Sequence, residues 1–162
     1  MRHLALPALV LLSTAVASPL QVALGAHDPA LPCGATTTPA LTVTGTPPAG
    51  TKSLALIVWD QQPHALSGRW LVYDLPPTTR TLTSVPAATL AVAGGYAATN
   101  EAGRPGYSPV CLRGAHDIYV DLYAIDVHSL NIAAGSSLQR VHALIKRHRL
   151  FEAKAHLPWV VR

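Results

Sequence analysis

Few residues of this sequence stand in the arrangements that catalysis requires. The chain contains no Gly-x-Ser-x-Gly nucleophile motif, no His-Glu-x-x-His motif and no phosphate-binding glycine loop followed by lysine. Its eight histidines invite a metal-site interpretation, but His142 and His148 are spaced wrongly to share a helix face as ligands at i and i+4 would. We therefore expect no catalytic residue, no cofactor and no metal site. A hydrolase using His116 with Asp60 is disfavoured, because no nucleophile accompanies them at a recognisable spacing.

The two cysteines, Cys33 and Cys111, restrict the possibilities further. Two cysteines cannot form a zinc ribbon or the framework of a disulfide-rich mini-protein. In an oxidising compartment, an even number of cysteines without metal-ligand spacing favours a disulfide between them. Two separate buried thiols are the alternative, and the sequence leaves both open.

Residues 1–17 have the features of a secretory signal peptide. A short basic start precedes an apolar run, and Ala-Val-Ala at 15–17 supplies the small residues that signal peptidase requires. The apolar run is shorter than the roughly 20 residues needed to span a bilayer, so we expect no stable membrane insertion. We expect cleavage after Ala17, with cleavage after Ala26 as the alternative, and a periplasmic or secreted protein.

Composition indicates one folded domain, residues 18–162, in the exported chain. The chain has 162 residues, of which 49% are hydrophobic and 12% charged, and this excludes an intrinsically disordered protein. The formal net charge is only +4, and no segment has the dense lysine and arginine content that neutralises nucleic-acid phosphates. We therefore expect no nucleic-acid partner.

The hydrophobic pattern is that of a mainly β protein with one C-terminal helix. Short apolar runs bounded by Pro, Gly and Thr predict strands, and residues 100–114, which are rich in Gly and Pro, predict a long ordered loop. The expected strands are 40–44, 53–59, 69–75 and 117–125, with a weaker, alanine-rich stretch at 82–95. Helical spacing of apolar residues predicts a helix over 137–155 that begins at Ser136 or Ser137. His148 falls on the apolar side of this helix, which predicts a buried, hydrogen-bonded histidine.

Five ordered sequence blocks resemble one known family. They are Cys33-Gly34 with residues 38–41 and 50–56; Asp60-Gln61-Gln62 with residues 69–76; Gly-Tyr-Ser-Pro-Val-Cys at 106–111; His116 with Tyr-Ala-Ile-Asp at 123–126; and residues 144–159. In this order they resemble the bacterial phosphatidylethanolamine-binding proteins, also called Raf-kinase-inhibitor-like proteins. The resemblance implies a β-sandwich with a large central sheet, a smaller sheet and a C-terminal helix. It also implies a pocket that binds small anions such as a phosphate group.

Carried over to this chain, the family pocket has an altered set of polar residues. The residues implied to line it are Asp60, Gln62, Arg69, Trp70, Tyr107, Pro109 and His116. Asp60, Tyr107 and His116 keep the family's residue types. Gln62 replaces the second acid of an Asp-Pro-Asp turn, Arg69 replaces the histidine of a His-Trp strand, and Pro109 replaces a loop glycine.

Arg69 leaves two interpretations open. An arginine offers a planar set of donors that suits a phosphate or carboxylate, which favours an anion-binding pocket. Alternatively, Arg69 pairs with Asp60 and closes the pocket, and Pro109 supports this slightly because it offers no backbone N–H. The first interpretation predicts an exported, non-enzymatic protein that binds a small anion or a phosphoryl head group. The second predicts an interaction or inhibitor protein that acts on a protein partner through its surface.

Overall fold

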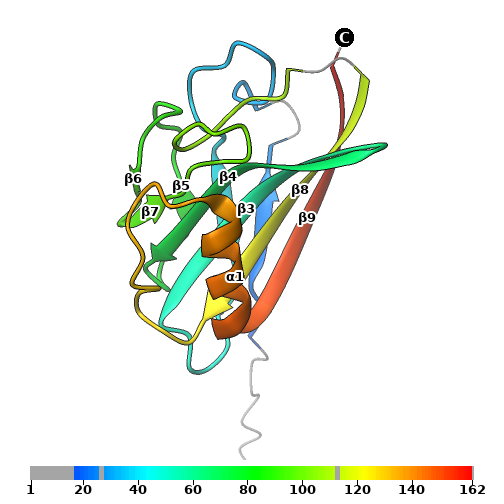
Figure 1. Ribbon diagram of the computed structural model, residues 1–162. Helices are drawn as coiled ribbons and strands as arrows, with labels where there is room; N and C mark the ends of the chain where they lie inside the picture. Colours follow the sequence, from blue (N-terminus) through cyan, green and yellow to red (C-terminus); the bar gives the residue numbers. More distant parts are fainter. Residues whose placement is uncertain (1–16, 26–27, 112–113, 162) are drawn as a thin grey trace, which may run out of the picture.

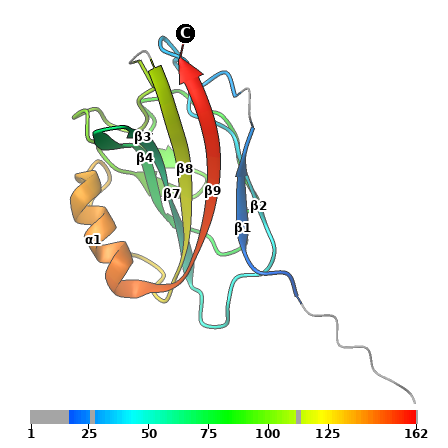
Figure 2. The ribbon, with the colours of Figure 1, turned by 90° about the vertical axis from the view of Figure 1, so that its right-hand side faces the viewer.

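The computed structural model describes residues 17–25, 28–111 and 114–161, so the predicted signal peptide lies outside the described residues except for Ala17. Two antiparallel β-sheets and one helix make up this part of the chain. Helix α1 (Leu138–His148) covers one face of the larger sheet, and the smaller sheet lies against the other face (Figures 1 and 2). The predicted mainly β sandwich with a helix near its C-terminus is confirmed. Within the described ranges no helix has the length and apolarity needed to cross a membrane.

The larger sheet has six strands in the order β6-β7-β4-β3-β8-β9. Their bounds are β3 (Ser53–Gln62), β4 (Ala65–Leu75), β6 (Ala91–Val92), β7 (Gly95–Ala97), β8 (Gly114–Ile125) and β9 (Arg149–Val161). Strand β3 lies in the interior of this sheet and is covered on both faces, so most of its residues are apolar. Leu56 and Val58 pack toward the smaller sheet, whereas Ile57 and Trp59 pack toward helix α1.

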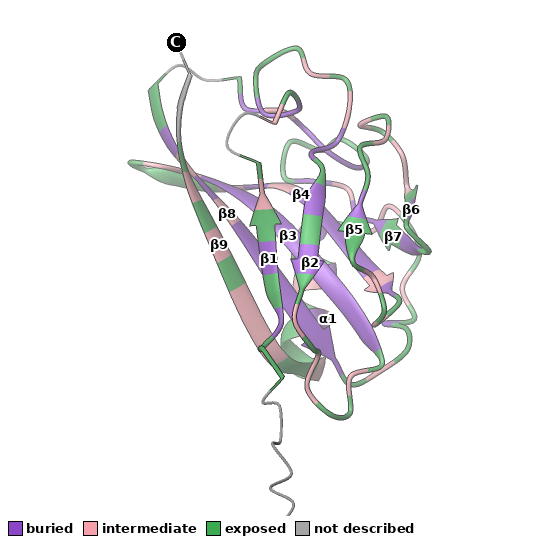
Figure 3. Ribbon diagram, turned by 180° about the vertical axis from the view of Figure 1, so that it is seen from behind, coloured by how far each residue is buried: buried purple, intermediate pink, exposed green. Residues whose placement is uncertain are grey.

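The smaller sheet contains β1 (Gln21–Leu24), β2 (Leu41–Thr44) and β5 (Thr81–Leu82) in the order β1-β2-β5. Strand β2 alternates buried and exposed residues, since one of its faces meets the core and the other meets solvent (Figure 3). Leu20, Leu41 and Leu82 bury their side chains between the two sheets. The hydrophobic core is therefore divided into two layers, one on each side of the larger sheet.

Helix α1 begins where the sequence predicted but ends earlier than the predicted residue 155. Ser137 is the N-cap, and Leu138, Val141 and Ile145 are buried against the sheet. The helix ends at His148, and the remaining residues form strand β9. In β9, Phe151, Ala153, Ala155 and Leu157 pack against the core between the sheets, which is the period of two that a strand requires.

The prediction that His148 is buried was wrong, whereas the predicted hydrogen bond is present. Its side chain is 38% exposed, and its Nδ1 lies 2.9 Å from Oδ1 of Asp126. The last residue of the helix sits at the turn into β9 and not under the sheet, so the apolar spacing that extended the helix misplaced it. His148 and Asp126 form an exposed pair, which contributes little to stability.

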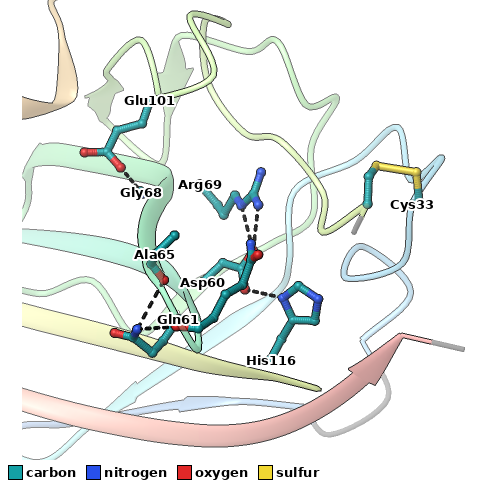
Figure 4. A network of polar contacts seen from close by, with 10 residues as sticks. Cys33, Asp60, Gln61, Ala65, Gly68, Arg69, Glu101 and His116 are labelled. Atoms are coloured by element: carbon teal, nitrogen blue, oxygen red, sulfur yellow. Dashed lines mark hydrogen bonds and ion pairs between the residues drawn. A yellow bond between two sulfur atoms is a disulfide. The ribbon is translucent and has the colours of Figure 1, made fainter. Parts of the chain in front are cut away.

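The two cysteines form a disulfide between Cys33 and Cys111, residues separated by 78 positions. It joins the segment after β1 to the loop that precedes β8. The predicted long loop is ordered by its own turns and by side-chain bonds from Asn100, whose Oδ1 accepts from the amides of Ala102 and Arg104. The disulfide attaches this loop to the segment after β1 (Figure 4).

Candidate functional site

A β-bulge in β4 determines where the side chain of Arg69 points. Trp70 pairs with Val58, and Gly68 pairs with the next residue of β3, so Arg69 is the extra residue. An extra residue interrupts the alternation of side chains between the two faces of a strand. Gly68 faces the helix, because a Cβ there would meet a leucine of α1, whereas Trp70 packs between the sheets. The bulge therefore lets Arg69 reach Asp60 on the face away from the helix.

Asp60 is fully buried, and polar neighbours hold both of its carboxylate oxygens (Figure 4). Arg69 donates to Oδ2 from Nη2 at 2.6 Å and from Nε at 3.2 Å, and Gln62 donates to the same oxygen at 3.3 Å. Nδ1 of His116 lies 2.6 Å from Oδ1. A buried carboxylate without such partners would be strongly unfavourable. The ion pair between Arg69 and Asp60, one of the two interpretations from the sequence, is thus formed.

Strand register brings His116 to Asp60. Asp60 pairs with Ile118 of β8, and His116 precedes Ile118 by two residues, so its side chain points to the same face of the sheet. The side chain of His116 is only 2% exposed. Asp60 and His116 lie on neighbouring strands of the rigid central sheet, which fixes their relative positions.

Arg69 also lines a cavity of about 430 Å³ that Asp60 does not reach. Its walls come from the disulfide, from the segment after it at Gly34 and Ala35, and from the loop that precedes β8. Arg69 and Arg104 are the charged residues among the described residues of its lining, which includes no acid. The cavity lining is therefore cationic, with buried Asp60 on the far side of Arg69.

The loop beside the cavity uses its own backbone donors. The amides of Tyr107 and Ser108 donate to carbonyls of Ala87 and Arg69, and Pro109 has no N–H. The hydroxyl of Tyr107 donates to the carbonyl of Ala30 at 2.7 Å, and burial is the main cause that raises the pKa of this tyrosine. The amides of Tyr107 and Ser108 are therefore not available to an anion in the cavity.

Side-chain donors remain for such an anion. Two of the five N–H groups of Arg69 donate to Asp60, and the described residues supply no acceptor for the others. Arg104 is exposed and makes no ion pair with any described acid. Oγ of Ser108 accepts a hydrogen bond from Asn100 at 2.8 Å, which leaves the hydroxyl proton of Ser108 available to donate.

The seven residues that the sequence suggested for the site fall into three groups. The cavity wall contains Arg69, Tyr107 and Pro109. The buried network next to it contains Asp60, Gln62 and His116. Trp70 belongs to neither group: it is fully buried and packs edge-on against Tyr107, with 6.2 Å between ring centroids.

Sequence analysis missed Arg104 and Ser108 as lining residues. The signal for both was the predicted long loop, because a loop of this length is commonly functional. Ser108 also lies within the block at 106–111 that resembles the family. The lining joins Arg69 with Arg104, whereas Asp60, which the sequence suggested for the pocket, lies outside it. No group of three or more metal-ligating side chains occurs within the described part of the chain.

Comparison with known proteins agrees with this architecture. Residues 17–158 match the family model described as phosphatidylethanolamine-binding protein. A UPF0098 protein of Aquifex aeolicus is 33% identical over 114 residues, which covers 68% of this chain and 66% of that relative, just under two thirds of its length.

Two solved structures have the same fold. Escherichia coli YbcL, described as a member of the mammalian PEBP family, superposes with a TM-score of 0.73 at 21% identity, covering 88% of this chain and 99% of that chain. CT736 of Chlamydia trachomatis, described as a putative phosphatidylethanolamine-binding protein homolog, gives a TM-score of 0.70 at 25% identity, covering 89% and 99%. With a family model that spans most of the chain, this chain belongs to the phosphatidylethanolamine-binding protein family.

Proposed function

We propose that this protein is an exported, non-enzymatic binding protein whose ligand is a small anion or a phosphoryl head group. The observation that supports this most is the cavity lined by Arg69 and Arg104 without an acidic residue. Guanidinium groups bind phosphate oxygens through several parallel N–H donors. A volume of about 430 Å³ is in the range typical of small-ligand pockets.

The ion pair with Asp60 prepares Arg69 for this role. It fixes the guanidinium, whose side chain is only 14% exposed, so little conformational freedom remains to be lost on binding. The N–H groups that Asp60 does not use are available to the ligand. The names of the matched family and of the Chlamydia trachomatis homolog include phosphatidylethanolamine, a lipid with a phosphoryl head group, which supports the same ligand class.

The arrangement gives no support to a catalytic role. The hydroxyl of Tyr107 is committed to a backbone carbonyl, and His116 is buried beside Asp60 and does not line the cavity. A general base must reach the proton that it removes, either directly or through one water. One observation favours the alternative function, an interaction or inhibitor protein that acts through its surface. Arg69 lies directly against Asp60 and pairs with it, so no ligand can lie between these two residues.

Calorimetric titration with phosphoethanolamine tests the proposal. We expect Arg104→Gln to weaken binding by about tenfold, the worth of one charge-assisted contact of roughly 1.5 kcal/mol. Because Arg104 has no ion-pair partner among the described residues, this variant leaves the buried network intact. Arg80→Gln is the matched control, since the guanidinium of exposed Arg80 donates to carbonyl oxygens of its own turn, and it should leave the affinity unchanged.

A pH series distinguishes the role of Arg69. Sulfate is the suitable probe, because its charge is constant over this range. Wild-type affinity should stay level from about pH 6 to 8, since arginine remains protonated. The Arg69→His variant should lose affinity for sulfate as the pH rises through about 6.5, the ordinary pKa of histidine, because the imidazole then loses its charge. Absence of wild-type binding at millimolar phosphoethanolamine and sulfate would favour the interaction-protein alternative.

Export also remains a proposal. A disulfide is typical of oxidising compartments, which supports it. Cleavage after Ala17 keeps strand β1, whereas cleavage after Ala26 would remove it together with buried Leu20 and Val22. Packing therefore favours the first site, and intact mass of the exported protein should give a chain that begins at Ser18.

A further inference from the structure

A second cavity, of about 410 Å³, lies on the helix face of the larger sheet, and it shares no residue with the cavity beside Arg69. Strands β3, β8 and β9 form its floor, and helix α1 forms one wall. Three aromatic side chains, Trp59, Tyr119 and Tyr123, belong to its lining. Leu66, at the tip of β4, also belongs to the lining and is 52% exposed. A large exposed leucine beside aromatic rings is the kind of surface that a ligand can cover.

The floor of this cavity is a pre-formed polar network around Asp121. This aspartate is only 6% exposed, and its Oδ2 accepts hydrogen bonds from Nε1 of Trp59 at 2.9 Å and from the hydroxyl of Tyr123 at 3.2 Å. Nε2 of His142 lies 3.4 Å from the same hydroxyl. Burial, with a contribution from Lys146, lowers the pKa of His142, so the imidazole is neutral at pH 7. The hydrogen bonds to Asp121 thus hold the side chains of Trp59 and Tyr123 in fixed orientations.

Both acids of the lining are already paired. Nζ of Lys154 lies 3.2 Å from Oδ1 of Asp121 and 2.8 Å from Oε1 of Glu152. Arg149 donates to the other oxygen of Glu152 at 2.5 Å. The hydrogen bond to Glu152 is the main cause that raises the pKa of Lys154, which keeps this ammonium charged. A cationic ligand would therefore have to displace Lys154 before it could reach Asp121.

One cation of the lining has no such partner. Lys146 projects from helix α1 into the lining and makes no ion pair with any acid in the described ranges. Three cationic side chains face two acids, so the cavity has a surplus of one positive charge at pH 7. This surplus lies beside an aromatic wall.

We propose that this cavity is a second binding site, specific for a small aromatic compound with one anionic group. The ring of the compound packs against Trp59 and Leu66, and the anion pairs with Lys146. Aromatic faces bind flat apolar groups with favourable offset or edge-on contacts. The site goes beyond the proposed anion-binding function, because it lies on the other face of the sheet and uses other residues.

Two probes of the same shape and opposite charge test the proposal. They are 2-naphthoate and 2-naphthylmethylammonium, each titrated by calorimetry and followed through the indole N–H signal of Trp59 in the NMR spectrum. We expect 2-naphthoate to bind and to shift this signal, and we expect the ammonium probe to bind at least fivefold more weakly. Lys146→Gln should weaken 2-naphthoate about fivefold. Leu66→Ser, at an exposed position, should also weaken it without lowering the melting temperature.

Matched controls keep the two sites distinct. Arg147→Gln removes a charge from the same helix but faces a different cavity, so 2-naphthoate affinity should not change. Arg104→Gln should likewise have no effect on 2-naphthoate, although it weakens phosphoethanolamine. Tighter binding of the ammonium probe, insensitivity to Lys146→Gln, loss of 2-naphthoate binding in Arg104→Gln, or no binding at millimolar 2-naphthoate would each overturn the proposal.

Discussion

Replacement of Arg69 by alanine should destabilise the folded protein, in addition to any effect on ligand binding. The change leaves the Asp60 carboxylate buried without its strongest cationic partner. Removal of one member of a buried ion pair costs about 3–5 kcal/mol. Asp60 keeps its contacts with Gln62 and His116, and the arginine side chain is 14% exposed, so we expect the lower end of that range, about 3 kcal/mol.

Urea unfolding followed by far-ultraviolet circular dichroism measures this loss. The midpoint should fall while the slope with urea stays constant, because the surface exposed on unfolding does not change. Arg104→Ala is the control, since an exposed arginine without an ion-pair partner should change the unfolding free energy by no more than about 0.5 kcal/mol. The contrast between the two arginines is what the geometry predicts.

A double-mutant cycle separates the ion pair from the packing of the arginine stem. Asp60→Asn combined with Arg69→Ala should be less destabilising than the sum of the single changes, with a coupling energy of about 1.5 kcal/mol or more. Two results would refute the reasoning: a loss below about 1 kcal/mol for Arg69→Ala, or additive single effects. Either would mean that water reaches Asp60 and compensates its charge.

Three further predictions concern the rest of the molecule. Burial lowers the pKa of His142, so the unfolded chain binds a proton at higher pH than the folded protein does. The contribution of this residue to stability is therefore complete above about pH 6.5 and is lost as the pH drops toward the pKa of the folded state. In His142→Gln, urea unfolding between about pH 7 and 5 should show a smaller loss of unfolding free energy than in the wild type. Reduction of the Cys33–Cys111 disulfide should cost roughly 4–5 kcal/mol in unfolding free energy under the chain-entropy model, and thiol labelling of unreduced, denatured protein should find no free cysteine. Gly106→Ala should be more destabilising than Gly103→Ala in thermal unfolding, because both glycines have positive φ but only at Gly106 would a Cβ overlap a backbone carbonyl.

Patterns that depend on burial alone were predictable from the sequence. The apolar run at 53–59 predicted a strand, and the run is continuous because both faces of β3 are covered in the fold. Strand β9 was missed for two reasons. The alanines at 153 and 155 fit a helix as well as a strand, and no Gly, Pro or Asn marks a turn between the end of helix α1 and the start of β9. Its pairing with β8 decides between the two, and that contact is not local in sequence.

The candidate site was predictable only for residues that a sequence motif identifies. Asp60 and His116 could be placed together by motif resemblance, and the register of β3 and β8 joins them. The orientation of Arg69 depends on a bulge in β4. Gly68 beside it is a residue type that often accompanies a bulge, but it does not show which residue is the extra one. Arg104 reaches the cavity because the loop folds back near the disulfide. The positions of Arg69 and Arg104 in the cavity wall thus depend on tertiary contacts that local sequence does not determine.

The geometry also bounds the affinity of the cavity beside Arg69. Its side-chain donors are the free N–H groups of Arg69, the exposed Arg104 and the hydroxyl of Ser108, whereas the amides of Tyr107 and Ser108 already donate to protein carbonyls. Two charge-assisted contacts contribute about 3–6 kcal/mol together, and a Kd of 1 mM corresponds to about 4 kcal/mol. Arg104 must lose side-chain freedom on binding, which offsets part of this gain. An isolated phosphate should therefore bind in the millimolar range, and a ligand that binds more tightly must also fill the apolar part of the cavity formed by Ala35, Ala87 and the ring of Tyr107.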